Sequence, residues 1–218
     1  MTGPAGLVLL PVFRGVRSGD VDRPMTTPDH DRLPKHLPRY VDNLWEWRRP
    51  EGLPSRRSCA FASPTPELAR RSGPPGGVVC RVLVRPPCRL VQLLGYPDAR
   101  NHPDVAFLAD AMVRIAADRP AVGAAMDTPL LSRADVDRVL SDLDDGSVRA
   151  LHDGITLWRS AVALPAAPDT DLADPAGEVL FEAPAGYLLE PVGAPPVDES
   201  VEWTERTDAV RPTRRGPR

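Results

Sequence analysis

The sequence predicts one α+β domain, because segments with the composition of β-strands lie toward both ends of the chain and helical segments lie between them. A chain of 218 residues is long enough to bury one sizeable core. Its 27 prolines shorten the regular elements and favour ordered loops. We expect a flexible N-terminal extension at 1–34, the single domain at 35–192 and a disordered C-terminal tail at 193–218.

Six segments are predicted to be strands because they are rich in β-branched and aromatic residues. They are 39–45, 58–62, 77–84, 88–94, 177–182 and 187–192. The segments 77–84 and 88–94 are separated only by Arg85-Pro86-Pro87, so a hairpin is expected there. The sheet is expected to pair the first of the six segments with the last.

Helix signals are strongest in the middle of the chain. Thr65 followed by Pro66 predicts an N-cap and a first helical position. Pro103 begins a longer segment with apolar residues on one face, ending before Pro120. Ser132-Arg-Ala-Asp135 predicts a capping box, and a third long helix is expected to begin at Ser147.

Composition excludes several classes of function. A formal charge of −3 gives no overall attraction to nucleic acid or to anionic membranes, so such binding would need a local patch. The three cysteines lack CxxC spacing and the histidines lack ligand spacing, so no metal site is expected. His102 is interpreted as packing or capping a helix start. The apolar run 6–13 is too short to cross a bilayer, and we expect a cytoplasmic protein without a membrane partner.

The most unusual local composition is an aromatic and arginine-rich segment. It holds Trp45, Trp47, Arg48, Arg49, Arg56 and Arg57. Such side chains can clamp a pyrophosphate while an aromatic face stacks on a base or nicotinamide ring. They can also grip RNA or single-stranded DNA, form a partner interface, or pack in the ordinary way with nearby carboxylates. The sequence leaves these alternatives open.

Two further residues could carry chemistry. Ser63 lies where a strand passes into a helix, a place where hydroxyls and backbone N–H groups can meet an anion or a ribose. Glu182 ends an otherwise apolar strand and could face a cleft, although a solvent-facing position is equally compatible.

The segments Arg39–Trp47 and Pro54–Ala69 resemble a group of uncharacterised bacterial proteins and, in arrangement, the ADP-ribosyltransferase superfamily. The resemblance implies twisted antiparallel or mixed sheets around a cleft, with a helical insert. In that superfamily an Arg or His on the first strand holds NAD, a hydroxyl residue follows on a later strand, and a late-strand Glu stabilises the oxocarbenium ion. These roles would fall to Arg39, Ser63 and Glu182, with Glu178 as the alternative carboxylate.

The activity that the resemblance implies is transfer of ADP-ribose from NAD, or hydrolysis of NAD, in a toxin or defence protein. NAD would be a substrate, and the acceptor would be a protein or a nucleic acid, with a cognate antitoxin as a further partner. NAD-binding contacts are expected from Tyr40, Asn43, Trp47, Arg56, Arg57 and Ser58. The lack of a Glu-x-Glu pair at Glu182 argues against protein arginines as acceptors. Whether translation starts at Met1 or Met25 stays open.

Overall fold

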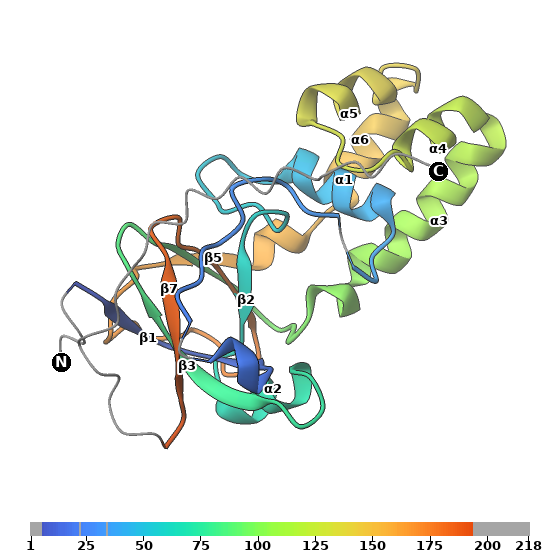
Figure 1. The fold of residues 1–218 in the computed structure, drawn as a ribbon. Coiled ribbons are helices and arrows are strands. Elements are labelled where there is room, and N and C mark those ends of the chain that lie inside the picture. The colour runs from blue at the N-terminus through green and yellow to red at the C-terminus, as the bar shows by residue number, and fades with distance from the viewer. Residues whose placement is uncertain (1–5, 22, 34, 194–218) are drawn as a thin grey trace, which may run out of the picture.

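The computed structural model describes residues 6–21, 23–33 and 35–193 and confirms the α+β class (Figure 1). The described strands form two antiparallel sheets. The first sheet has the order β1 (Val8–Val16), β3 (Val78–Val84), β7 (Tyr187–Pro191). The second has the order β2 (Ala60–Ala62), β6 (Glu178–Glu182), β4 (Arg89–Leu93), β5 (Ala161–Leu164).

Most helices gather on one side of the sheets (Figure 1). They are α1 (Arg39–Arg48), α3 (Pro103–Asp118), α4 (Pro120–Met126), α5 (Arg133–Leu140) and α6 (Asp145–Gly154). The short helix α2 (Pro66–Ser72) instead packs against β1 and β3. Short 3₁₀ turns lie at Ser18–Asp20, Ala99–Asn101 and Leu157–Ser160. None of the described helices combines the length and the apolar character needed to cross a bilayer.

The second sheet is buried on both faces. Val179 and Phe181 of β6 pack in a core that also contains β1, β3 and β7 residues such as Val82. Leu180, which points to the opposite face, packs in the core formed with the helices, which also contains Leu44. The molecule therefore has three layers, with the second sheet in the middle. Because both faces of this sheet are buried, the sequence of β6 is almost continuously apolar.

Several predicted elements are confirmed. The strand at 58–62 appears as β2, and the late strands appear as β6 and β7. Early strands do pair with late ones, β2 with β6 and β3 with β7, but the expected pairing of segment 39–45 with the last strand is wrong, because β7 pairs with β3 and segment 39–45 is not a strand. Thr65 caps α2, and Ser132 forms the capping box of α5. Helix α3 has the predicted bounds, with His102 as its N-cap, whereas α6 begins at Asp145, two residues before the predicted start.

The predicted strand at 39–45 is wrong, because this segment is helix α1. Val41, Leu44 and Trp45 are buried at helical spacing, with Asp42 in the first turn. Their apolar and aromatic character resembled a strand, but the period is that of a helix facing the core.

The predicted flexible extension at 1–34 is wrong for residues 8–16, which form β1. This strand pairs with β3, with an irregularity between Leu10 and Phe13, and Pro11 lies inside that interruption. A chain that started at Met25 would lack β1. The predicted tail lies, apart from Gly193, outside the described residues.

The predicted hairpin of 77–84 with 88–94 is also wrong. Both strands exist, as β3 and β4, but they belong to different sheets, and β4 lies between β5 and β6. The connection through Pro86 and Pro87 therefore passes from one layer to the other instead of folding back within one sheet. Strand β5 and helix α4 are elements that the sequence patterns did not predict.

Candidate functional site

A cavity of about 640 Å³ lies where β1, the end of β2 and the start of β6 meet. Its wall is completed by α2 residues, by the segment 97–100 and by the segment 32–37, in which Pro34 lies outside the described residues. Edge strands of the two sheets meet here, because the backbone groups of Phe13 and Ser63 exchange two hydrogen bonds of 2.8 Å. This bridge places Arg14 and Ser63 on the same cavity wall.

Arg14 projects from β1 into this region. Its Nη1 donates a hydrogen bond of 2.6 Å to the hydroxyl of Tyr187, and its guanidinium lies 5.6 Å from the centre of that ring. The next residue, Gly15, lies directly against α2. A Cβ on Gly15 would come 2.3 Å from the carbonyl oxygen of Ala69, so the close approach of strand and helix requires glycine here.

Glu178, at the start of β6, contributes a buried carboxylate to the cavity. Its Oε2 accepts hydrogen bonds from Arg56 Nη1 at 2.7 Å and from the backbone N–H of Ala99 at 3.2 Å. Among the described residues, no donor contacts Oε1. One carboxylate oxygen is thus fixed by the protein, and the other remains able to face a ligand.

Arg56 is held by aromatic rings as well as by Glu178. The guanidinium carbon lies 5.7 Å from the centre of the Trp45 ring and 4.9 Å from that of Phe61, within the range of cation–π contact. Burial acts to lower the pKa of Arg56, but the charge of Glu178 and the hydrogen bond to it, with smaller contributions from Cys59 and Asp98, together raise the pKa above the ordinary value. Arg56 therefore carries its positive charge at neutral pH.

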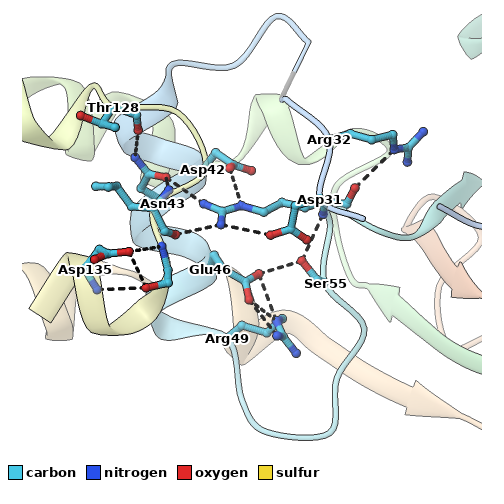
Figure 2. A network of polar contacts seen from close by, with 12 residues as sticks. Asp31, Arg32, Asp42, Asn43, Glu46, Arg49, Ser55, Thr128 and Asp135 are labelled. Atoms are coloured by element: carbon cyan, nitrogen blue, oxygen red, sulfur yellow. Dashed lines mark hydrogen bonds and ion pairs between the residues drawn. The ribbon is translucent and has the colours of Figure 1, made fainter. Parts of the chain in front are cut away.

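Arg57 belongs to a separate buried network that ties the loop before β2 to the helices. Figure 2 shows its partners Asp42 and Asn43 side by side on α1. Its Nε donates to Asp42 at 2.7 Å, its Nη2 to Asn43 at 2.8 Å and its Nη1 to the carbonyl of Leu131 at 2.9 Å. Burial raises the pKa of Asp42 in spite of the opposing charge of Arg57. Each nitrogen of the Arg57 guanidinium therefore already donates to an acceptor within the protein. Arg57 supports the cavity wall and does not present a bidentate pair of N–H groups to a ligand.

The predicted catalytic trio does not converge. Arg39 is exposed on α1 and lies 3.6 Å from Asp127, outside the cavity. Glu182 forms an ion pair with Arg89 at the other end of β6 from Glu178, also outside the cavity. Of the three, only Ser63 lines the cavity. The alternative carboxylate, Glu178, is the one that lies there.

The predicted cofactor contacts divide in the same way. Arg56 and Arg57 line the cavity, whereas Tyr40, Asn43, Trp47 and Ser58 do not. Asn43 is fully buried and donates to backbone carbonyls, including that of Thr128 at 2.8 Å. Trp47 donates to Asp137 at 2.6 Å, in a second hollow lined by residues of α5 and α6.

The aromatic and arginine-rich segment therefore does not form a single binding surface. Trp45 is 1% exposed, and Arg57 is buried with its carboxylate partner. Arg49 pairs with Glu46 at 2.7 Å. Ordinary packing and pairing account for most of this composition, which argues against the stacking surface for RNA or single-stranded DNA that was considered from the sequence.

The sequence patterns missed Arg14, Arg32 and Lys35, all of which line the cavity. The available signal was the apolar run before Arg14, whose β-branched residues fit a strand as well as an extension.

Cys59 is not a candidate nucleophile, because it is buried and burial raises the pKa of its thiol to about 12. Within the described ranges, no group of three or more His, Cys, Asp or Glu residues could hold a metal ion.

No family model, curated protein or solved structure matches the chain.

Proposed function

We propose that the cavity binds NAD and that the protein cleaves its nicotinamide–ribose bond, as an ADP-ribosyltransferase or an NAD glycohydrolase. The observation that carries the proposal is the meeting of Arg14, Ser63 and Glu178 in one cavity of about 640 Å³. A volume of this size suits a ligand as large as a dinucleotide. The two edge strands that carry Arg14 and Ser63 are held together by the backbone bridge at Phe13.

The resemblance noted from the sequence assigned the NAD-binding arginine to Arg39, which lies on helix α1 outside the cavity, so that assignment is not supported. Arg14 enters the proposal in its place because it lies on β1 and lines the cavity. Ser63 keeps the position between a strand and a helix. The late-strand carboxylate in this proposal is Glu178, the alternative considered from the sequence. It lies four residues before Glu182 on the same strand, β6.

In this proposal each residue has a distinct task. Arg14 attracts the pyrophosphate, and Ser63 contacts the ribose or a phosphate through its hydroxyl and backbone. When the C1′–N bond breaks, its electron pair leaves with nicotinamide and positive charge develops on the ribose. The Oε1 of Glu178 stabilises that charge, while Arg56 and the N–H of Ala99 hold Oε2 in place. Water or an acceptor then bonds to C1′.

The test is nicotinamide release from NAD by the wild-type protein and by two matched pairs of variants. Glu178→Gln should lower the rate by about 100-fold or more, the usual value of one electrostatic group at a developing charge. Glu182→Gln removes the same charge from the same strand outside the cavity and should leave the rate within about twofold. Likewise Arg14→Met should abolish the NAD-induced rise in melting temperature, and Arg39→Met should retain it.

Folding must be measured beside activity, because Glu178→Gln leaves Arg56 without its carboxylate partner. Circular dichroism and the melting temperature without ligand provide that check. The proposal is wrong if the folded wild-type protein neither releases nicotinamide nor gains stability with NAD. It is equally wrong if Glu182→Gln loses as much activity as Glu178→Gln.

A further inference from the structure

The cavity carries positive charge that the protein itself does not neutralise. All three carboxylates that line it are already paired with arginines. The pairs are Glu178 with Arg56, Asp42 with Arg57, and Asp98 with Arg100. Three further cations line the cavity, namely Arg14, Arg32 and Lys35, and in the part of the chain that the structure describes none of them has a carboxylate partner. In a chain with a formal charge of −3, this is a local excess of cations.

Within the described ranges, the groups that accept hydrogen bonds from Arg14 and Arg32 are neutral. Arg32 donates through Nη2 to the carbonyl of Cys59 at 2.5 Å and through Nε to that of Arg57 at 3.3 Å. These bonds fix the guanidinium at the cavity wall without cancelling its charge. Lys35 is exposed and belongs to the same wall. Because Arg14 is assigned to the pyrophosphate of NAD, Arg32 and Lys35 are the two cations that can bind a second substrate.

This arrangement discriminates between acceptors by charge. A cationic acceptor, such as an arginine side chain of a protein, would need a carboxylate partner of its own. Each described cavity carboxylate already pairs with an arginine, and the Oε1 of Glu178 faces the ribose in the proposed reaction. An anionic acceptor would instead be attracted by Arg32 and Lys35. A terminal phosphate carries close to two negative charges at neutral pH, which matches these two cations.

We propose that the acceptor is the terminal phosphate of a nucleic acid strand, an inference that rests on the proposed function. A phosphate oxygen forms a bond to C1′ of the ribose as the C1′–N bond breaks. The bonding pair leaves with nicotinamide and cancels its positive charge, and no proton needs to move. A strand fits better than a phosphopeptide, because the adjoining backbone phosphates add further anions next to the exposed Lys35, whereas a peptide brings a single phosphate.

The experiment incubates the full chain with NAD labelled in the adenylate half and with short single strands of RNA or DNA. The strands carry a 5′-phosphate, a 3′-phosphate or hydroxyl ends, and a phosphopeptide and a small phosphomonoester are tested beside them. We expect label on phosphate-ended strands only, with transfer that falls steeply as salt is raised. Nicotinamide release without any acceptor is followed in parallel.

Lys35→Ala should lower the ratio of strand transfer to nicotinamide release by about tenfold, the value of one charge-assisted hydrogen bond. Arg149→Ala, which removes an exposed cation of α6 outside this cavity, is the matched control and should transfer normally. Because Lys35 is exposed and its side chain has no hydrogen bond among the described residues, its replacement should not disturb folding.

Several outcomes would overturn the inference. Nicotinamide release without label on any strand would refute the acceptor and leave the proposed function intact, whereas no release at all would refute both. Equal labelling of hydroxyl-ended strands, or preferential labelling of the phosphopeptide, would assign the acceptor to another class. If Lys35→Ala instead weakened binding of a 2′-phosphorylated dinucleotide and spared transfer, the surplus charge would serve the first substrate.

Discussion

Replacing Asp104 with asparagine should destabilise the whole domain, because this buried carboxylate connects three separate parts of the helical layer. It lies in the first turn of α3 and is 2% exposed. Its oxygens accept hydrogen bonds from Trp45 Nε1 at 3.0 Å, from the Thr156 hydroxyl at 2.8 Å and from the Leu157 N–H at 2.9 Å. The backbone N–H of Thr156 also donates to it, at 3.0 Å.

The size of the effect follows from these donors. An asparagine at position 104 keeps one oxygen and presents an NH₂ group where the second oxygen accepted hydrogen bonds. The favourable orientation keeps the amide oxygen at the Oδ2 position, to which Trp45 and Leu157 donate, and turns the NH₂ group toward the Thr156 hydroxyl, which can accept a hydrogen bond. The donors then lose a charged acceptor. Hydrogen bonds to charged groups contribute about 1.5–3 kcal/mol each and neutral ones about 1 kcal/mol, so we expect a loss of about 1–3 kcal/mol in the free energy of unfolding. Such a loss is a large share of the total stability of an ordinary domain.

Urea denaturation followed by tryptophan fluorescence measures this loss, with Asp118→Asn as the control. Asp118 ends the same helix with 81% of its side chain exposed, and its replacement should cost less than about 0.5 kcal/mol. If Asp104→Asn costs less than about 1 kcal/mol, or no more than Asp118→Asn, the carboxylate does not connect the layer as argued.

The pH dependence of the same variant supplies a second check. Burial acts to raise the pKa of Asp104, but the hydrogen bonds that it accepts outweigh burial, and the pKa lies below the ordinary value. The ionised group therefore contributes stability that is fully present above about pH 4, the unfolded value, and is lost as pH falls through the folded pKa. The gap between wild type and Asp104→Asn should narrow in acid. A gap that stays constant down to the lowest pH would contradict this account.

Two further substitutions test the support of the cavity. Arg57→Met leaves Asp42 buried without its cation, so we expect a loss of about 3–5 kcal/mol in urea denaturation, whereas Arg39→Met, at an exposed pair, should cost less than about 1 kcal/mol. Equal losses would show that burial of the pair does not matter. Gly15→Ala should separate β1 from α2, because its Cβ would lie 2.3 Å from the carbonyl oxygen of Ala69. We expect a loss of about 1–3 kcal/mol in the free energy of unfolding and weaker binding of NAD by calorimetry. Unchanged stability would contradict the close approach of strand and helix.

The helices were predictable where their signals are local. Thr65 with Pro66, and Ser132 with Asp135, satisfy the backbone groups of their own first turn, so the neighbouring sequence is sufficient to find them. Helix α1 was missed because its N-cap, Pro38, has no side-chain hydrogen bond to announce a helix start. What identifies it is the burial of Val41 and Leu44 at helical spacing.

Strand pairing was less predictable, because it depends on segments far apart in the chain. β3 and β4 are joined by only a few residues, yet they pair with β1 and β7 in one sheet and with β5 and β6 in the other. A short connection is typical of a hairpin, and only the burial of both faces of β4 reveals that it lies in the middle layer.

The candidate site shows how one misassigned element changes a functional prediction. Ser63 was placed correctly because its position depends only on the local passage from β2 into α2. The sequence predicts a strand at 39–45 and therefore points to Arg39, but this segment is helix α1, whereas the strand whose arginine lines the cavity is β1, with Arg14.

The choice between the two glutamates of β6 could not be made from the strand pattern at all. Glu178 and Glu182 lie on the same face, because they are separated by an even number of residues. They are also about 13 Å apart along the strand, so only one of them can reach a given site. The groups that decide between them are Arg56 and the N–H of Ala99 at one end, and Arg89 at the other, and all three come from other parts of the chain. A carboxylate on a strand therefore becomes a site candidate only when the partners at each end of that strand are known, and Glu178→Gln against Glu182→Gln compares those two ends directly.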